Sequence, residues 1–115
     1  MAKKKRKLFW LSYDLGLKGD YSSLYTWLDT MQAKECGNSI ASFWFEYDSN
    51  YTKELKESLE EAIEVNKNYR FYLIWRSVKD AKTSVTGQFL FGKRKPAPWE
   101  GYADGFEDAN DEESS

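Results

Sequence analysis

The sequence predicts an α+β domain in which a small, mainly antiparallel sheet carries two helices on one face. Segments in which apolar residues alternate with polar ones indicate strands, and two amphipathic segments of helical periodicity indicate the helices. The chain has 115 residues, of which 41% are hydrophobic and 17% aromatic, enough apolar material for one compact core. No apolar run approaches the ~18 residues of a membrane span, so we expect a soluble protein with no membrane partner.

The first half of the chain predicts a strand, a helix and a second strand-like segment. Alternating residues indicate a strand over 8–15, after which Asp20 caps a helix of about four turns that ends before Gly37. Cys36 falls near the end of that helix, where we expect a buried side chain rather than a nucleophile. Residues 40–48 are again strand-like, and the pattern leaves open one continuous strand or two short ones.

The second half predicts a helix that opens at Thr52, followed by strands over 69–77 and 85–91. The outer face of this helix is acidic and would repel a phosphate backbone. An element order of β-α-β-(β)-α-β-β with short connections favours a ferredoxin-like two-layer sandwich. Two helices cover only one face of its sheet, so the other face must meet solvent, nucleic acid or another subunit.

Charge is distributed unevenly along the chain. The net charge is −2 at pH 7, yet residues 1–7 carry five positive charges and residues 100–115 carry seven negative ones, while 8–99 hold twelve of each sign. We therefore predict a basic flexible arm over residues 1–7, a single domain over 8–99 and an acidic disordered tail over 100–115. The arm could be an import signal, a phosphate-binding segment or only a solubility feature. A further hypothesis is that the acidic tail folds over the basic arm or over Lys93–Lys95 and competes with nucleic acid.

The sequence contains no histidine and one cysteine. Catalysis by Ser-His-Asp or Cys-His arrangements is thereby excluded, as are zinc and haem sites that depend on histidine. No internal disulfide can form, and no apolar signal segment follows the basic start, so we expect a cytoplasmic protein without an organic cofactor.

Strand alternation predicts which side chains lie on the sheet face that the helices leave uncovered. They are Trp10, Ser12, Asp14, Ser42, Trp44, Glu46, Asp48, Arg70, Tyr72, Ile74 and Arg76. Aromatic rings mixed with arginines fit a homodimer interface, or a platform that stacks bases and contacts phosphate. Both interpretations stay open. The candidates for nucleic-acid binding are Trp10, Trp44, Arg70, Arg76 and the cluster of Lys93, Arg94 and Lys95 beyond the last strand.

Four short motifs stand in an order that resembles a known family. They are Tyr13-Asp14-Leu15, Leu24-Tyr25 after Tyr21, the segment Ser42-Phe43-Trp44-Phe45-Glu46, and Leu55, Leu59 and Ile63 before the strand that starts at Tyr69. Over about residues 8–76 the chain is similar to the small Cas-two family of CRISPR adaptation and its VapD-like toxin relatives. The resemblance implies a ferredoxin-like protomer, a homodimer with facing sheets and a role in defence or in a toxin-antitoxin system.

In nucleolytic members of that family, an aspartate at the end of the first strand helps to hold a divalent metal, and Asp14 matches its position. The resemblance thus implies an endonuclease in which two copies of Asp14 hold Mg²⁺ or Mn²⁺ at the dimer axis. Asp20 or Glu46 could assist, while Arg70, Arg76 or the Lys93–Lys95 cluster holds phosphate.

Other members of the family are dimeric scaffolds without activity, and Lys18 is the one basic residue in the loop that follows the first strand. Our prediction is therefore a non-catalytic homodimeric module that binds nucleic acid or a protein partner. The alternative is the metal-dependent endonuclease, in which Asp14 is both metal ligand and catalytic residue.

Overall fold

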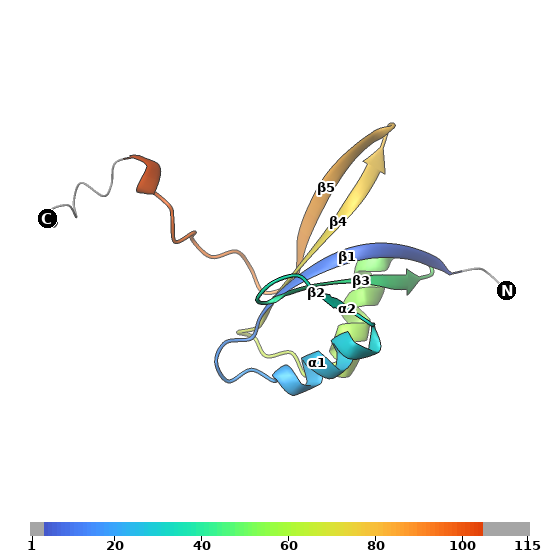
Figure 1. The fold of residues 1–115 in the computed structure, drawn as a ribbon, viewed down its shortest axis with the longest axis horizontal. Coiled ribbons are helices and arrows are strands. Elements are labelled where there is room, and N and C mark those ends of the chain that lie inside the picture. Colours follow the sequence, from blue (N-terminus) through green and yellow to red (C-terminus); the bar gives the residue numbers. More distant parts are fainter. Residues whose placement is uncertain (1–3, 105–115) are drawn as a thin grey trace, which may run out of the picture.

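The computed structural model describes residues 4–104 and contains one sheet with two helices. Its elements are β1 (Lys5–Asp14), α1 (Tyr21–Thr30), β2 (Lys34–Glu35), β3 (Ile40–Tyr47), α2 (Tyr51–Ala62), β4 (Arg70–Lys79), β5 (Lys82–Phe91) and the 3-10 turn η1 (Tyr102–Asp104). The strand order is β2-β3-β1-β4-β5, and every pairing is antiparallel. Both helices lie on the same side of the sheet (Figure 1). The predicted α+β class is confirmed, but with a fifth strand at its edge the sheet does not have the classical ferredoxin-like order.

The core lies between the sheet and the two helices. On β1, Phe9 and Leu11 are fully buried, and the ring of Phe9 contacts four other rings, those of Phe43, Phe45, Tyr51 and Trp75. The helices contribute their apolar stripes, with Leu24, Leu55 and Leu59 fully buried. Trp27 of α1 packs on Phe43 and donates an indole N–H hydrogen bond to Ser58 of α2 over 3.1 Å. This contact joins the helices to each other and to β3.

No helix of the described residues lies on the opposite face of the sheet (Figure 1), and we call it the open face. Trp10 is only partly buried there, and the residues beside it in the strand register are Ser42 on β3 and Ile74 on β4. Trp44, next to Leu8, keeps 53% of its surface exposed. Because paired residues of an antiparallel sheet share a face, the predicted division of side chains between the two faces is confirmed.

Helix α1 ends earlier than the sequence predicts. It stops at Thr30, where Gln32 takes a left-handed backbone conformation (φ 58°) and the Ala33 N–H bonds to the Leu28 carbonyl over 3.0 Å. This is a Schellman ending with glutamine at the place that glycine usually occupies, so the sequence carries no stop signal. The residues beyond it form β2, which pairs with β3 through a hairpin.

Two further expectations for this region are wrong. Cys36 is exposed in the hairpin connection, where its thiol donates to the Lys34 carbonyl over 3.6 Å and lies 3.5 Å from the Ser42 hydroxyl, rather than buried on a helix. The segment Ile40–Tyr47 is one continuous strand, so no turn interrupts it near Ser42.

The start of α2 is held by side chains. Asn50 caps the helix by accepting a hydrogen bond from the Lys53 N–H over 3.1 Å. The Glu54 carboxylate reaches back and accepts three backbone N–H bonds, from Asp48 (2.8 Å), Ser49 (2.9 Å) and Asn50 (2.9 Å). These bonds favour the ionised form and lower the pKa of Glu54 from 4.5 to about 2.

Replacing Glu54 by glutamine should change how the free energy of unfolding depends on pH. The depressed pKa means that Glu54 stabilises the fold above pH 4.5 and that this contribution is lost as the pH falls toward about 2. The difference in free energy of unfolding between the wild type and Glu54→Gln should therefore be greatest near neutral pH and shrink below pH 4.5. Urea unfolding from pH 7 to pH 2.5 measures it.

The matched control is Glu60→Gln, on the same helix, because Glu60 makes no hydrogen bond or ion pair within residues 4–104. Its unfolding profile should follow the wild type over this range. A constant offset between wild type and Glu54→Gln at every pH would contradict the assignment.

The β4–β5 hairpin extends beyond the rest of the sheet. β4 pairs with β1 only from Arg70 to Trp75, and its remaining residues pair with β5 alone. Asp80 and Ala81 form the two-residue turn, both with positive φ (53° and 64°), which matches the twist that tight hairpins require. The outer half of the hairpin therefore diverges from β1 and β3 (Figure 1).

The ends of the described chain also differ from expectation. β1 begins at Lys5, so the last residues of the predicted flexible arm 1–7 belong to the sheet. The first residues of the predicted tail form η1 at Tyr102–Asp104, and the tail beyond residue 104 lies outside the described residues. Within residues 4–104, no helix is both long and apolar enough to span a membrane.

Candidate nucleic-acid interface

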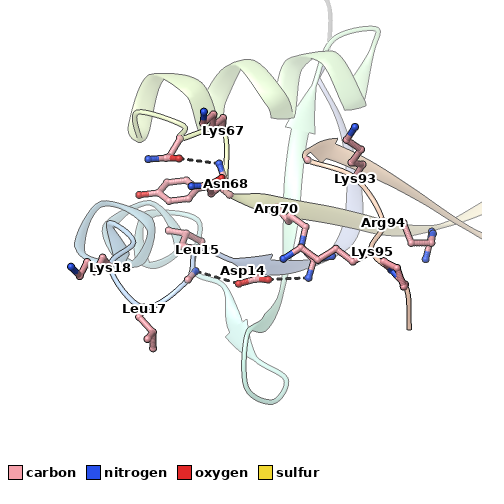
Figure 2. A pocket seen from close by; sticks show the side chains of 15 residues that line it. Asp14, Leu15, Leu17, Lys18, Lys67, Asn68, Arg70, Lys93, Arg94 and Lys95 are labelled. Atoms are coloured by element: carbon pink, nitrogen blue, oxygen red, sulfur yellow. Dashed lines mark hydrogen bonds and ion pairs between the residues drawn. The ribbon is translucent and has the colours of Figure 1, made fainter. Parts of the chain in front are cut away.

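A basic groove lies at the end of the sheet where β1 ends and β4 begins. It has a volume of about 850 Å³ and is lined by residues 14–18, 66–70 and 92–96. Among residues 4–104, six cationic side chains line it, against the single carboxylate of Asp14: Lys18, Lys67, Arg70, Lys93, Arg94 and Lys95. Figure 2 shows Lys18, Lys67 and Lys93 around its rim, with Arg70 and Lys95 beside Asp14. We call this the basic groove.

The loop after β1 forms one wall of the basic groove. Gly16 has a positive φ of 75°, and its N–H donates to the Asp14 carboxylate over 3.2 Å, which turns the chain sharply at the end of the strand. The Tyr21 hydroxyl donates to the Gly16 carbonyl over 2.8 Å. Tyr69 accepts a hydrogen bond from the Asp20 N–H over 2.9 Å. These contacts hold the loop that carries Lys18 against the start of β4.

Gly92 brings the second group of cations to the same place. Its φ is 81°, and a Cβ there would lie 2.8 Å from the Tyr69 carbonyl oxygen and 2.7 Å from Arg70 Cγ. Only glycine lets the chain turn this tightly over the start of β4. The segment Lys93–Lys95 therefore leaves β5 directly beside Arg70.

Asp14 is engaged in an ion pair. Its Oδ2 accepts a hydrogen bond from the Arg70 guanidinium over 2.9 Å, and its Oδ1 accepts the Gly16 N–H. The hydrogen bond from Arg70 is the main cause of the lowered pKa of Asp14, and Lys95 adds to it. The Nε of Arg70 is buried without a hydrogen-bond partner among residues 4–104.

The residues of one copy do not fit the divalent metal that the resemblance implies. Both Asp14 oxygens already have partners, and Arg70 places a positive charge beside them. Asp20 instead caps α1 by accepting from the Ser23 N–H over 3.1 Å, and Glu46 pairs in register with Arg6 at the other end of β1. Within residues 4–104, no three acidic or cysteine side chains gather where they could hold a metal ion.

Arg94 connects the basic groove to the open face. Its guanidinium lies 5.4 Å from the ring centroids of both Tyr72 and Phe89, which are paired across β4 and β5 with 4.7 Å between centroids. A smaller hollow between Ser12 and this arginine–aromatic cluster continues the surface toward the middle of the sheet. Cationic and aromatic groups therefore form one continuous surface there.

The structure separates the predicted nucleic-acid-binding residues into two groups. Arg70, Lys93, Arg94 and Lys95 meet in the basic groove. Trp10, Trp44 and Arg76 lie together at the other end of β1, in a cleft of about 620 Å³. This cleft, which we call the tryptophan cleft, is lined by Arg6, Lys7, Leu8, Trp10, Trp44, Arg76 and Val78.

Four cationic residues that line these two sites are missing from the sequence-based candidates: Lys18, Lys67, Arg6 and Lys7. Lys18 and Lys67 are isolated in the sequence, and only the folded chain brings their loops to one end of the sheet. Arg6 was assigned to the flexible arm, although its alternation with Leu8 and Trp10 continues the strand period and could have marked it.

The chain was compared with family models, curated proteins and solved structures. No family model, no curated protein and no solved structure matches the chain.

Proposed function

We propose that this chain is a non-catalytic nucleic-acid-binding module that holds the phosphate backbone in the basic groove. The observation that carries the proposal is the convergence of six cationic side chains around one carboxylate that is itself neutralised by Arg70. An excess of cations along a groove next to partly exposed aromatic side chains, here Tyr72 and Phe89, is typical of proteins that bind phosphate and bases together. No glutamate of helix α2 is among the residues that line the groove.

A ferredoxin-like protomer of the Cas-two and VapD type is part of the proposal. Its support is that β4, β1, β3 and β2 are neighbours in the order of a ferredoxin-like sheet, with β5 added outside β4. A role in defence or in a toxin-antitoxin system rests on that resemblance alone, whereas the expected cytoplasmic location rests on the single cysteine, which cannot form an internal disulfide. The homodimer that it implies stays a prediction, and sedimentation of the full chain would measure it.

The test is a binding titration by fluorescence anisotropy with labelled DNA and RNA at 50 and 200 mM salt. Counterion release predicts that a single strand contacting four phosphates loses roughly 50-fold in affinity over this range. The same strands, incubated with Mg²⁺ or Mn²⁺ and with chelator, should remain intact. Absence of binding at 50 mM salt would overturn the proposal in favour of a protein partner, and metal-dependent cleavage would overturn its non-catalytic part.

Replacing Asp14 by asparagine should tighten binding. The change removes the only carboxylate of the basic groove and releases Arg70 for one further phosphate contact, which corresponds to roughly fivefold in affinity at 100 mM salt. The ion pair is partly exposed, with 29% and 48% of the two side chains accessible, so its loss should cost less than about 1 kcal/mol of stability.

Asp29→Asn on α1 is the control, since it makes the same charge change outside the groove. The nuclease alternative makes the opposite prediction for Asp14→Asn, namely loss of metal-dependent cleavage. Weaker binding by Asp14→Asn, with Asp29→Asn unchanged, would contradict the role of Arg70.

A further inference from the structure

We propose that the tryptophan cleft takes an unpaired base, so that the open face selects single-stranded nucleic acid over duplex. This inference rests on the proposed function, because the same strand must first be held by the basic groove. The tryptophan cleft is then a second binding site about 20 Å from Asp14, since Trp44 is opposite Leu8, six residues before Asp14 on β1.

The cleft exists because the β4–β5 hairpin diverges from β1. Pairing between β1 and β4 stops at Phe9 opposite Trp75, so Arg76 and Val78 face the first half of β1 without bonding to it. The hollow between them is open toward solvent and has Trp10 and Trp44 in its wall. Figure 1 shows the same divergence of the hairpin from β1 and β3.

The aromatic side chains of the cleft are available for stacking. Trp44 is 53% exposed, and the guanidinium of Arg6 lies 5.0 Å from its ring centroid. Trp10 lies in the same wall, on the neighbouring strand. Exposed rings with an arginine beside them bind bases through their π faces without requiring a particular sequence.

The charges of the cleft favour a polyanion over an apolar partner. Among residues 4–104 its lining includes the guanidinium groups of Arg6 and Arg76 and no carboxylate, and neither arginine has an ion pair. Lys7 also lines the cleft, but its ammonium lies on the helix side of β1, 5.1 Å from the ring centroid of Tyr51 on α2. A second copy docked here by twofold symmetry would bring the arginines of both copies together, which is unfavourable. A nucleic-acid strand provides phosphates for the cations and bases for the rings.

The distance between the two sites favours a flexible strand. A chain of several nucleotides can span about 20 Å, which agrees with the ~4–16 nucleotides that single-strand-binding folds cover. A duplex offers only the edges of its bases, because their faces are stacked inside the helix. It can therefore occupy the basic groove but cannot place a base against Trp44.

The experiment compares the full chain with Trp44→Ala, Trp44→Phe and Trp99→Ala. Anisotropy at 100 mM salt measures the affinity for a labelled 12-nucleotide DNA, the same sequence in RNA, and the corresponding duplex. We expect at least tenfold tighter binding of single strands, and a loss of roughly 5- to 100-fold in Trp44→Ala for single strands only. Trp44→Phe should keep most of the affinity.

Trp99→Ala is the matched control, because Trp99 is 73% exposed and lines neither the basic groove nor the tryptophan cleft. It should bind like the wild type. Arg76→Gln provides a second test that keeps both tryptophans and should weaken binding of single strands by roughly fivefold, as one lost phosphate contact predicts.

The possible failures are distinguishable. Equal binding of duplex and single strands, unaffected by Trp44→Ala but weakened by changes at Lys93 and Lys95, would overturn this inference and keep the proposed function. Failure of every strand to bind at 50 mM salt would overturn both. Self-association that Trp44→Ala abolishes, with nucleic-acid affinity unchanged, would identify the cleft as an interface between copies and also overturn the inference.

Discussion

Replacing Lys93 and Lys95 together by alanine is expected to weaken nucleic-acid binding by roughly 25-fold at 100 mM salt. Each phosphate contact of a single strand contributes about 0.7 to the slope of log affinity against log salt, so two lost contacts lower that slope by about 1.4. Both side chains lie on the turn that Gly92 positions over the start of β4, and neither contributes to the core. The fold should therefore be unaffected. Anisotropy titrations from 50 to 200 mM salt measure the affinity and the slope together.

The matched control removes the same charge elsewhere. Lys53→Ala/Lys82→Ala changes two exposed cations, one on α2 and one at the end of the β4–β5 hairpin, that line neither the basic groove nor the tryptophan cleft. If binding depends on net charge alone, the two double variants will lose the same affinity. If the groove holds the phosphates, only the Lys93 and Lys95 variant will show the reduced slope.

Replacing Phe9 by alanine is expected to destabilise the protein by about 3–5 kcal/mol. Its side chain is fully buried at the centre of the core, with ring centroids of Tyr51 at 5.7 Å and Trp75 at 6.0 Å. Truncation removes these contacts and leaves a cavity that the surrounding rings cannot fill. Because small domains are stable by about 5–15 kcal/mol, the variant should lose a large share of its stability. Urea unfolding at pH 7 measures the loss, and Phe9→Leu should lose much less.

Trp10, the next residue, provides the contrast. It points to the open face, so Trp10→Ala should cost less stability than Phe9→Ala and should weaken the binding of single strands. Comparing Phe9→Ala with Trp10→Ala therefore distinguishes an effect on stability from an effect on binding. Equal destabilisation by the two changes would mean that the open face is covered in the folded protein.

The alternation of side chains along the strands could be predicted from the sequence. Phe9 and Trp10 lie on opposite faces because a β-strand turns each successive side chain to the other side, whatever the strand pairs with. The two amphipathic helices follow for the same reason, since their apolar stripes have a local period. Asp20 was correctly predicted to cap α1, because its carboxylate bonds to an N–H only three residues away.

Features without a local signal were not predicted. Gln32 ends α1 in a left-handed conformation for which glycine is the usual sequence signal. Because that signal is missing, the predicted helix continues through the residues of the short strand β2. The divergence of the β4–β5 hairpin depends on where its pairing with β1 stops, which no single segment encodes.

The candidate sites also combine features that the local sequence predicts with features that only the tertiary fold creates. The cluster Lys93–Lys95 and the aromatic residues of the open face are visible as runs and alternations in the chain. The fold brings Lys18 and Lys67 to the same groove as the Lys93–Lys95 cluster, and it pairs Asp14 with Arg70. Lys18 and Lys67, like Asp14 and Arg70, are about fifty positions apart in the sequence. Local periodicity determines which way each side chain points, because it depends only on the backbone of its own element. Which of these side chains meet depends on strand order and register, and those are set by the packing of the whole core.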